Sequence, residues 1–337
     1  MSTALTGIRP TGELTVGNVI GAIQPMVELQ DTFEGDVNVF VADMHGLTDQ
    51  EPEVVNRSRL DTARTFMAAG VDPEKTTLYL QSQVGRPTVE LATLLDRHIT
   101  PAELRRVPTL KDKLRPGQSE DQVNMSLFRY PILMAADIMV AEADHVPVGA
   151  DQVAHLEVAR LLARRFNRDY GRGETILVEP DIAIVEGIKI AALRGGGKMS
   201  KSEPSTALLL TDKPDVVANK IRRAETTTEP GAMPETLASH FMVAERLATT
   251  DDQRAAVAAV KAEHLAGKAV MGAFKGLLTD ITNEYLGGFQ ERFNGLSDAE
   301  VKRVLIEGGE RASVKAEGVL DRVYRALGLM SSKFLYE

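Results

Sequence analysis

Two lysines three residues apart are the clearest candidates for chemistry in this chain. Lys198 and Lys201 lie in residues 195–202 (GGGKMSKS), directly after three glycines and with Ser200 between them. Two ammonium groups on a glycine-rich loop suit a triphosphate that accumulates charge as pyrophosphate leaves. A Walker loop needs Ser or Thr directly after Gly-Lys, and Met199 stands there instead, so a P-loop ATPase is disfavoured. The alternative is an ordinary soluble surface loop.

A second candidate is the segment at residues 10–18 (PTGELTVGN), between a predicted strand and a predicted helix. Gly12 and Gly17 carry no side chain, so a flat base or a phosphate can approach the backbone. The helix start adds free N–H groups and a partial positive charge. Thr15 and Asn18 offer neutral hydrogen-bond donors. The alternative is a common strand-to-helix turn, since Pro-Thr-Gly is frequent turn chemistry.

The third candidate lies in residues 130–152 (YPILMAADIMVAEADHVPVGADQ). Asp137 is surrounded by leucine, isoleucine, methionine and alanine, and a carboxylate is costly to bury there unless it is paired. One use for such a group is to accept a hydrogen bond from a ligand N–H. The alternative is an aspartate on the exposed edge of a helix. Gly149, Asp151 and Gln152 form a further polar cluster at a predicted helix start.

The elements that position these segments alternate between strands and helices. Short β-rich runs predict strands at residues 3–8, 37–43, 76–81 and 175–178. Helical patterns predict helices at residues 18–29, 53–69 and 151–165, the last capped by Asp151 with Val153, Leu156, Leu161 and Leu162 inside. This alternation predicts right-handed βαβ units and a parallel sheet. After about residue 206 the β signal disappears, which predicts a helical second domain.

Composition limits the classes of function. The chain has 337 residues, so two domains are expected, and its 43% hydrophobic content suits a globular protein. No apolar run approaches the ~20 residues that span a bilayer, and we expect a cytoplasmic protein without membrane contact. With no cysteine, disulfides and thiolate zinc sites are excluded. The net charge of −9 confines RNA contacts to local basic patches, for which the candidates are Arg105, Arg106, Lys111, Lys113 and Arg115, and Lys220, Arg222 and Arg223.

Taken together, these segments resemble the class I aminoacyl-tRNA synthetases. Residues 10–18 resemble the first signature of that class, and KMSKS matches the second letter for letter. YPILMAADI followed by VPVGADQ resembles the tryptophanyl branch of the class, bacterial type, more than the tyrosyl branch. The likeness covers nearly the whole chain. It implies an α/β fold in which a Rossmann-like parallel sheet, the class I catalytic fold, is followed by a helical C-terminal domain.

The resemblance also implies roles for individual residues. Those implied to bind ATP, with Gly17 under the adenine ring, are Arg9, Pro10, Thr11, Gly17, Asn18, Gly149, Asp151, Ile190, Lys198, Met199, Ser200 and Lys201. Those implied to bind tryptophan, with Asp137 accepting the indole N–H, are Leu5, Gly7, His45, Tyr130, Met134, Asp137, Val146, Val148 and Gln152. The implied catalytic set is Thr15, Asn18, Lys113, Lys198, Ser200 and Lys201.

The implied partners are L-tryptophan, ATP with Mg²⁺ carried on its phosphates, tRNA(Trp) and a second copy of the chain. The implied division is a catalytic domain at residues 1–205, an anticodon-binding region at 206–290 and returning helices at 291–337. Leu5 stands where the family often has an aromatic residue, Arg9 replaces a common glutamine, and residues 107–110 (VPTL) also depart from the pattern. Three rival functions stay open: a tyrosyl-tRNA synthetase, a small-molecule nucleotidyltransferase and a non-catalytic paralogue that binds a partner.

Overall fold

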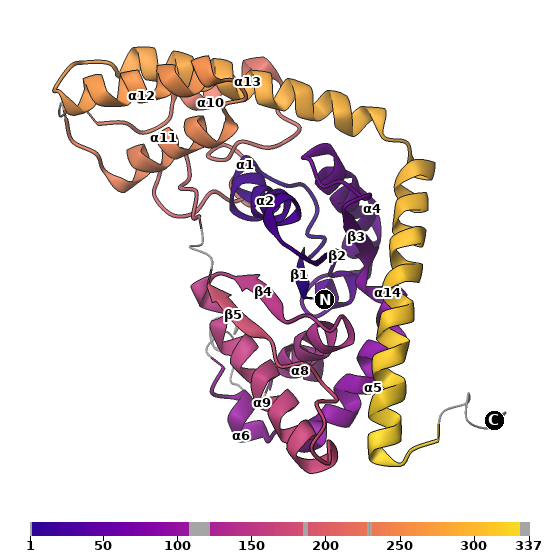
Figure 1. Cartoon of the computed structure of the whole chain (residues 1–337). Coiled ribbons are helices and arrows are strands. Elements are labelled where there is room, and N and C mark those ends of the chain that lie inside the picture. Colours follow the sequence, from indigo (N-terminus) through magenta and orange to yellow (C-terminus); the bar gives the residue numbers. More distant parts are fainter. Residues whose placement is uncertain (1, 108–121, 185–187, 228, 230, 331–337) are drawn as a thin grey trace.

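The computed structural model describes residues 2–107, 122–184, 188–227, 229 and 231–330 (Figure 1). The strands are β1 (Thr3–Ile8), β2 (Asp36–Val41), β3 (Thr76–Leu80), β4 (His145–Val148) and β5 (Asp181–Ile184). The helices and helical turns of the first half are α1 (Val16–Asn18), η1 (Val19–Ile23), α2 (Gln24–Thr32), α3 (Asp43–Gly46), α4 (Pro52–Ala68), η2 (Gln81–Val84), α5 (Gly85–Leu95), η3 (Asp96–His98), α6 (Pro101–Leu104), α8 (Met125–Val140), η5 (Ala150–Gln152) and α9 (Val153–Tyr170). Those of the second half are α10 (Pro214–Arg222), α11 (Glu235–Leu247), α12 (Asp251–Leu265), α13 (Met271–Gly295) and α14 (Asp298–Leu327).

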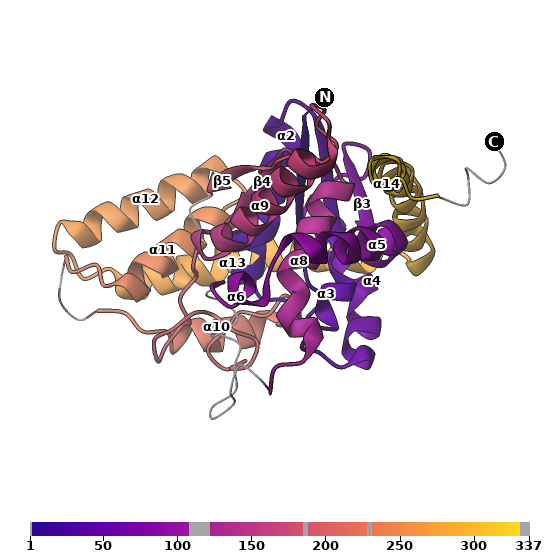
Figure 2. The same cartoon turned by 90° about the horizontal axis from the view of Figure 1, so that it is seen from below.

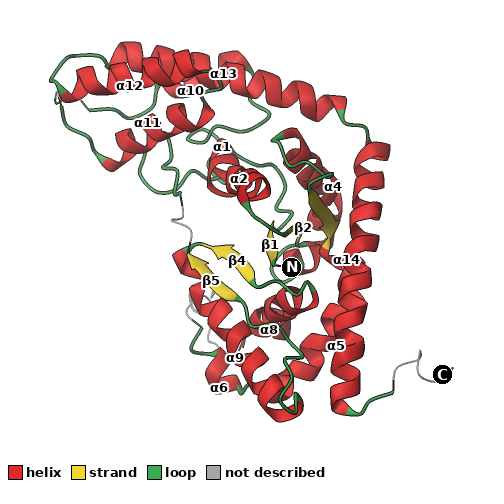
Figure 3. Cartoon of the chain, in the orientation of Figure 1, coloured by secondary structure: helices red, strands yellow, loops and turns green. Residues whose placement is uncertain are grey.

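The five described strands form one parallel sheet in the order β3-β2-β1-β4-β5. Helices cover both faces, which is the arrangement that right-handed βαβ units impose. Seen from below in Figure 2, α5, α8 and α9 lie in front of the sheet. Figure 3 shows the strands enclosed between helical layers, as a parallel sheet requires. The predicted α/β class with a parallel sheet is therefore confirmed.

Most predicted elements of the first half are confirmed within two residues. The strand predicted at 3–8 is β1, and those predicted at 37–43 and 76–81 are β2 and β3. The helix predicted at 18–29 begins earlier, at Val16, because Thr15 caps it: the Thr15 hydroxyl accepts from the Asn18 N–H, and the Asn18 side chain accepts from the Thr15 N–H. The chain then passes through one π-helical turn, η1, into α2.

Two local predictions are wrong. Residues 175–178 form no strand, because Asn167 on α9 satisfies their backbone: its side chain accepts from the N–H groups of Ile176 and Leu177 and donates to the Leu177 carbonyl. The strand comes a few residues later, as β5. Asp151 is not the helix cap, since it is exposed within η5, and Gln152 precedes α9 without a side-chain cap bond.

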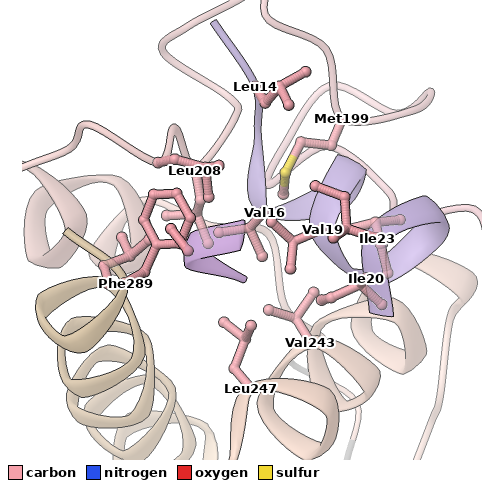
Figure 4. Close-up of a cluster of buried hydrophobic side chains, with 14 of the residues drawn as sticks. Leu14, Val16, Val19, Ile20, Ile23, Met199, Leu208, Val243, Leu247 and Phe289 are labelled. Atoms are coloured by element: carbon pink, nitrogen blue, oxygen red, sulfur yellow. The ribbon is translucent and has the colours of Figure 1, made fainter. Parts of the chain in front are cut away.

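The helical second half shares a core with the first helix of the chain. One buried cluster joins residues of β1, β2, η1 and α4 to residues of α10, α11 and α13. Figure 4 shows Val16, Val19 and Ile23 facing side chains that come from much later in the sequence, among them Val243, Leu247 and Phe289. The domain boundaries at 205/206 and 290/291 stay a prediction, and α13 runs through the second of them.

Helix α14 crosses the open edge of the sheet. Its first half contributes Val301 and Leu305 to the core on one face, and its second half contributes Val319 and Val323 to the core on the other. Between them, Gly308 lies so close to β3 that a Cβ there would be 1.9 Å from the Leu78 carbonyl oxygen. The helix thus covers the outer backbone of the edge strand. Within the described residues, no helix is long and apolar enough to span a membrane.

Candidate active site

Polar residues gather at the carboxyl edge of the sheet, where the strand ends of a parallel sheet meet. Arg9 follows β1, Asp43 follows β2, Gln81 follows β3 and Gly149 follows β4. Asp137 reaches the same edge from α8. Ligands of open α/β sheets bind outside these ends, so the site falls where the topology predicts.

The two glycine-bearing loops meet at this edge. A Cβ on Gly12 would lie 3.5 Å from Nζ of Lys201, and a Cβ on Gly17 would lie 3.5 Å from the Cβ atoms of both Ile190 and Met199. The Met199 N–H donates to the Ile190 carbonyl over 2.8 Å. Figure 4 shows the Met199 side chain directed toward the helix that carries Val19 and Ile23. The structure therefore brings together residues that the sequence separates by almost two hundred positions.

Backbone geometry explains the glycines before KMSKS. Gly195, Gly196 and Gly197 have φ values of +80°, +70° and +80°, a region that residues with a Cβ rarely adopt. This turn reverses the chain, so that Ala192 N–H donates to the Gly197 carbonyl over 3.0 Å. Lys198 and the residues after it then run back beside the first loop.

The charges at the two glycine-bearing loops are cations that are exposed or partly exposed. Lys201 lies near Arg9, and the pKa of Lys201 is lowered first by burial and then by the Arg9 charge, against a smaller raising effect from Glu13. Arg9 pairs with Asp49 at 2.7 Å. Lys198 and Ser200 are exposed. Two cations facing one place bind an anion more readily than either alone.

Thr15 and Asn18, which were predicted to be donors to a ligand, bond to each other at the start of α1. The Thr15 side chain is buried and caps α1, and its hydroxyl lies 3.0 Å from Oδ1 of Asn18. Pro10 and Thr11 lie directly after β1, and Pro10 is buried. Lys113, which was predicted to contact phosphate, lies outside the described residues.

Asp137 belongs to a buried side-chain network. Asp137 is 5% exposed, and its Oδ2 accepts from Nε2 of Gln81 over 2.7 Å. The same Nε2 lies 2.8 Å from Nδ1 of His45, and the His45 N–H donates to Oε1 of Gln81 over 3.0 Å. Asp137, His45 and Gln81 therefore act as one hydrogen-bonded unit. Burial raises the pKa of Asp137 well above its usual range, the Gln81 hydrogen bond lowers it, and the Asp43 charge raises it again.

Aromatic and apolar residues surround this network. The Tyr130 ring lies edge-on to His45 with centroids 6.4 Å apart, and its hydroxyl lies 2.6 Å from Nε2 of His155. Met134 is partly buried and lies one helical turn before Asp137 on α8. Val146 is buried and Val148 is partly buried on β4.

The turn after β4 joins the remaining predicted residues. Nε2 of Gln152 donates to Oδ2 of Asp151 over 2.8 Å, and a Cβ on Gly149 would lie 2.7 Å from Oδ1 of Asp151. Glycine is therefore the residue that lets the Asp151 carboxylate fold back over this turn.

Leu5 and Gly7 lie on β1 in different surroundings. Leu5 is buried in the core cluster that also holds Tyr79 and Ile138. A Cβ on Gly7 would lie 2.3 Å from the Phe40 carbonyl oxygen and 2.8 Å from its ring, so glycine here makes room for Phe40.

Three residues of this region escaped the sequence analysis: Gln81, Asp43 and His155. The Asp43 carboxylate accepts from the N–H and the hydroxyl of Ser82 at 2.9 and 2.6 Å, which ties the end of β2 to the end of β3. Asp43 and Gln81 were the last letters of two predicted strands. A polar residue closing a parallel strand is a signal for a site at the carboxyl edge, and it was available in the sequence.

Comparison with known proteins agrees with this geometry. The family model of the class I tRNA synthetases for W and Y matches residues 1–287. The chain therefore belongs to this family of ligases, which act on tRNA. Tryptophan–tRNA ligases from Caulobacter vibrioides and Helicobacter pylori J99 are 35% and 36% identical, each over 96% of this chain and 94% and 98% of the relative. Within the class, the chain thus falls among the bacterial-type tryptophanyl-tRNA synthetases.

Solved structures give the same result. Tryptophanyl-tRNA synthetase from Mycoplasma pneumoniae superposes with a TM-score of 0.83 at 29% identity, covering 98% of this chain and 99% of that one. The Campylobacter jejuni synthetase, solved with ADP and tryptophan, gives 0.80 at 29% identity, covering 97% and 100%. The predicted class I catalytic fold is confirmed.

Proposed function

We propose that this chain activates L-tryptophan with ATP, giving tryptophanyl-adenylate and pyrophosphate, and then transfers tryptophan to a ribose hydroxyl at the 3′ end of tRNA(Trp). The observation that carries the proposal is the contact between the two glycine-bearing loops, Gly12 against Lys201 and Gly17 against Met199, at the sheet edge that also holds Asp137. One nucleotide and one amino acid would then lie side by side.

The nucleotide takes the loop side of this edge. Adenine would lie against the bare backbone of Gly17, and Lys198, Lys201 and Arg9 would face the phosphates. Mg²⁺ would travel on the ATP oxygens, where it neutralises charge and needs few protein ligands. Glycine at positions 12 and 17 supports this fit, because the Cβ of any other residue would enter the space between the loops.

Tryptophan takes the buried side. Asp137 would accept the indole N–H, and the polar turn at Asp151 and Gln152 would hold the ammonium group or the ribose. The amino-acid carboxylate is already a nucleophile at neutral pH and attacks the α-phosphorus directly, so no general base is needed. Catalysis then depends on positioning and on charge stabilisation by the lysines.

For tRNA binding, we propose residues 206–290 as the anticodon-binding region. The two predicted basic patches differ in their support. Arg105 and Arg106 are exposed, as a patch requires, whereas Lys220 is held by Asp212 at 2.6 Å and is no free RNA contact. The other cations of the first patch, Lys111, Lys113 and Arg115, lie outside the described residues.

Two further expectations come from the family. We propose that two copies of the chain assemble into a homodimer and that the enzyme works in the cytoplasm. Sedimentation of the purified chain tests the first, and cell fractionation tests the second.

The decisive experiment is amino-acid-dependent ATP–pyrophosphate exchange on the purified chain. Exchange is expected with tryptophan and not with tyrosine or phenylalanine. Exchange with tyrosine alone would reassign the chain to the tyrosyl branch, and no exchange with any amino acid would favour a different nucleotidyltransferase. The chain contains no tryptophan, so indole fluorescence excited where tyrosine is silent reports only bound ligand and measures affinity separately.

A further inference from the structure

Gln81 occupies the centre of the buried network, and its place at the end of a predicted strand is the one feature of its segment that marks it as a site residue. It directly follows β3, it is 0% exposed, and its side chain spans from His45 on α3 to Asp137 on α8. An amide this deeply buried is destabilising unless all its polar atoms are satisfied. Here its oxygen and its nitrogen both have partners, so the group has one orientation.

The His45 backbone decides that orientation. A backbone N–H can only donate, so the atom that it contacts at 3.0 Å is the amide oxygen of Gln81. The amide nitrogen then faces Oδ2 of Asp137 at 2.7 Å and Nδ1 of His45 at 2.8 Å. In this arrangement the Gln81 amide nitrogen can donate one N–H to each of the two groups.

The direct contact between His45 and Asp137 is weaker than the hydrogen bond from Gln81 to Asp137. Nδ1 of His45 lies 3.4 Å from Oδ2 of Asp137, longer than a good hydrogen bond between these groups. Gln81 is therefore the residue that restrains the Asp137 carboxylate.

We propose that Gln81 is a positioning residue for amino-acid selection: it holds Oδ2 of Asp137 so that Oδ1 is presented to the indole N–H of tryptophan. This inference rests on the proposed function, because it needs an indole partner for Asp137. It assigns selectivity to a pair of side chains from η2 and α8 and not to the aspartate alone.

Electrostatics make the pair sensitive to pH. The charged and titratable groups near Asp137 are His45 and Asp43 from α3 and Tyr79 from β3, with Gln81 of η2 as its hydrogen-bond partner. Burial and the Asp43 charge raise the pKa of Asp137, and Gln81 lowers it. A protonated carboxyl is a weaker acceptor than a carboxylate. Tryptophan binding should therefore weaken as pH falls through this pKa, and loss of the Gln81 bond should move that weakening to higher pH.

The test compares Gln81→Leu and Gln81→Glu with the parent chain in ATP–pyrophosphate exchange from about pH 6 to pH 9. For Gln81→Leu we expect the KM for tryptophan to rise about 10- to 100-fold, the range for a hydrogen bond to a charged group, while the KM for ATP changes less than about twofold. The pH at which its tryptophan KM begins to rise should shift upward. Gln81→Glu should bind tryptophan best toward low pH, where the two carboxyl groups can share a proton.

Gln83→Leu is the matched control. Gln83 lies two residues further along η2, where its side chain donates to the Leu305 carbonyl over 2.9 Å and accepts from the Leu80 N–H over 2.8 Å. It should lower thermal stability without moving the pH profile for tryptophan. If Gln81→Leu folds and keeps the parent profile, or if Gln83→Leu shifts the profile equally, the positioning role is wrong. A parent chain that exchanges with no amino acid would instead sink the proposed function.

Discussion

The two sides of the site are built by different means. On the nucleotide side, backbone turns bring two loops together, and the charged groups, Lys198 and Lys201, are exposed. On the amino-acid side, side chains from three elements bond to one another out of contact with water, through Gln81 and Asp137. The first side offers charge to a ligand that brings its own counterions. The second offers one acceptor at a fixed position.

Because of this difference, we expect the exposed cations to contribute binding strength and the buried acceptor to contribute selectivity. Exposed cations are screened by salt and tolerate many polyanions. A buried acceptor discriminates strongly, because a ligand without the matching N–H leaves it unsatisfied. We therefore expect changes on the nucleotide side to affect the rate of activation for any amino acid, and changes on the amino-acid side to affect which amino acid is used.

The largest expected effect is on the nucleotide side. Replacing Lys198 and Lys201 together by alanine should slow ATP–pyrophosphate exchange by at least about 10³-fold, because the charge developing on pyrophosphate loses its stabilisation. Tryptophan affinity measured by ligand fluorescence should change less than about twofold. The exposed Lys213, outside the site, supplies the control variant Lys213→Ala. Equal loss of tryptophan binding in the double variant would show that the two sides are not separate.

The next effect is on the amino-acid side. Asp137→Asn leaves a single acceptor oxygen, which the Gln81 N–H occupies, so an amide N–H would face the indole N–H. The KM for tryptophan should rise about 100-fold, and the preference over phenylalanine should fall, while the KM for ATP stays unchanged. Steady-state exchange with each amino acid measures this. Similar losses for ATP and tryptophan would remove Asp137 from the indole site.

One glycine from each side allows the two sides to be compared by the effect of alanine on the free energy of unfolding. Gly7→Ala should lower the free energy of unfolding by about 3 kcal/mol, since its Cβ would meet the Phe40 carbonyl oxygen at 2.3 Å. Gly196→Ala has no atom within 4 Å of its Cβ, and it should lose only about 1 kcal/mol from its left-handed backbone. Thermal unfolding of both variants gives the order. A less stable Gly196→Ala would contradict it.

The smallest effect is that of salt. Raising the ionic strength from about 0.05 to 0.5 M should increase the KM for ATP a few-fold, because exposed cations are screened, and should leave the KM for tryptophan within about twofold. Exchange assays at matched temperature and magnesium concentration measure both. A tryptophan KM that follows salt as steeply as the ATP KM would mean that water reaches Asp137.

The sequence predicts the two glycine-bearing loops better than the buried network around Asp137 for a physical reason. The backbone of Gly12 and the charge of Lys201 are properties of the residues themselves, so local patterns reveal them. Asp137 could be buried or exposed from its segment alone, because the neighbours that decide this come from β2 and β3. Gln81 closes a predicted strand, but its role was not predicted, since its partners come from α3 and α8.

The fold shows the same limit at smaller scale. Runs of β-branched and aromatic residues such as β2 are predictable because an uninterrupted apolar run indicates a strand that is buried on both faces. Residues 175–178 read equally well as a strand, yet the Asn167 side chain takes their hydrogen bonds. The true strand, β5, has only four residues, too few for a pattern. A single side chain from a neighbouring helix can thus override local preference.

The crossing of β3 by α14 has a consequence for how the protein is made. Synthesis proceeds from the amino terminus, so all strands leave the ribosome long before residues 298–327 do. Until then the outer edge of β3 presents unpaired backbone N–H and C=O groups with which another nascent chain can pair. When α14 forms, it covers the outer edge of β3, and Gly308 allows the helix to approach the strand closely. A chain that ends before α14 therefore leaves the outer edge of β3 exposed to pairing with other chains, and it is prone to aggregation.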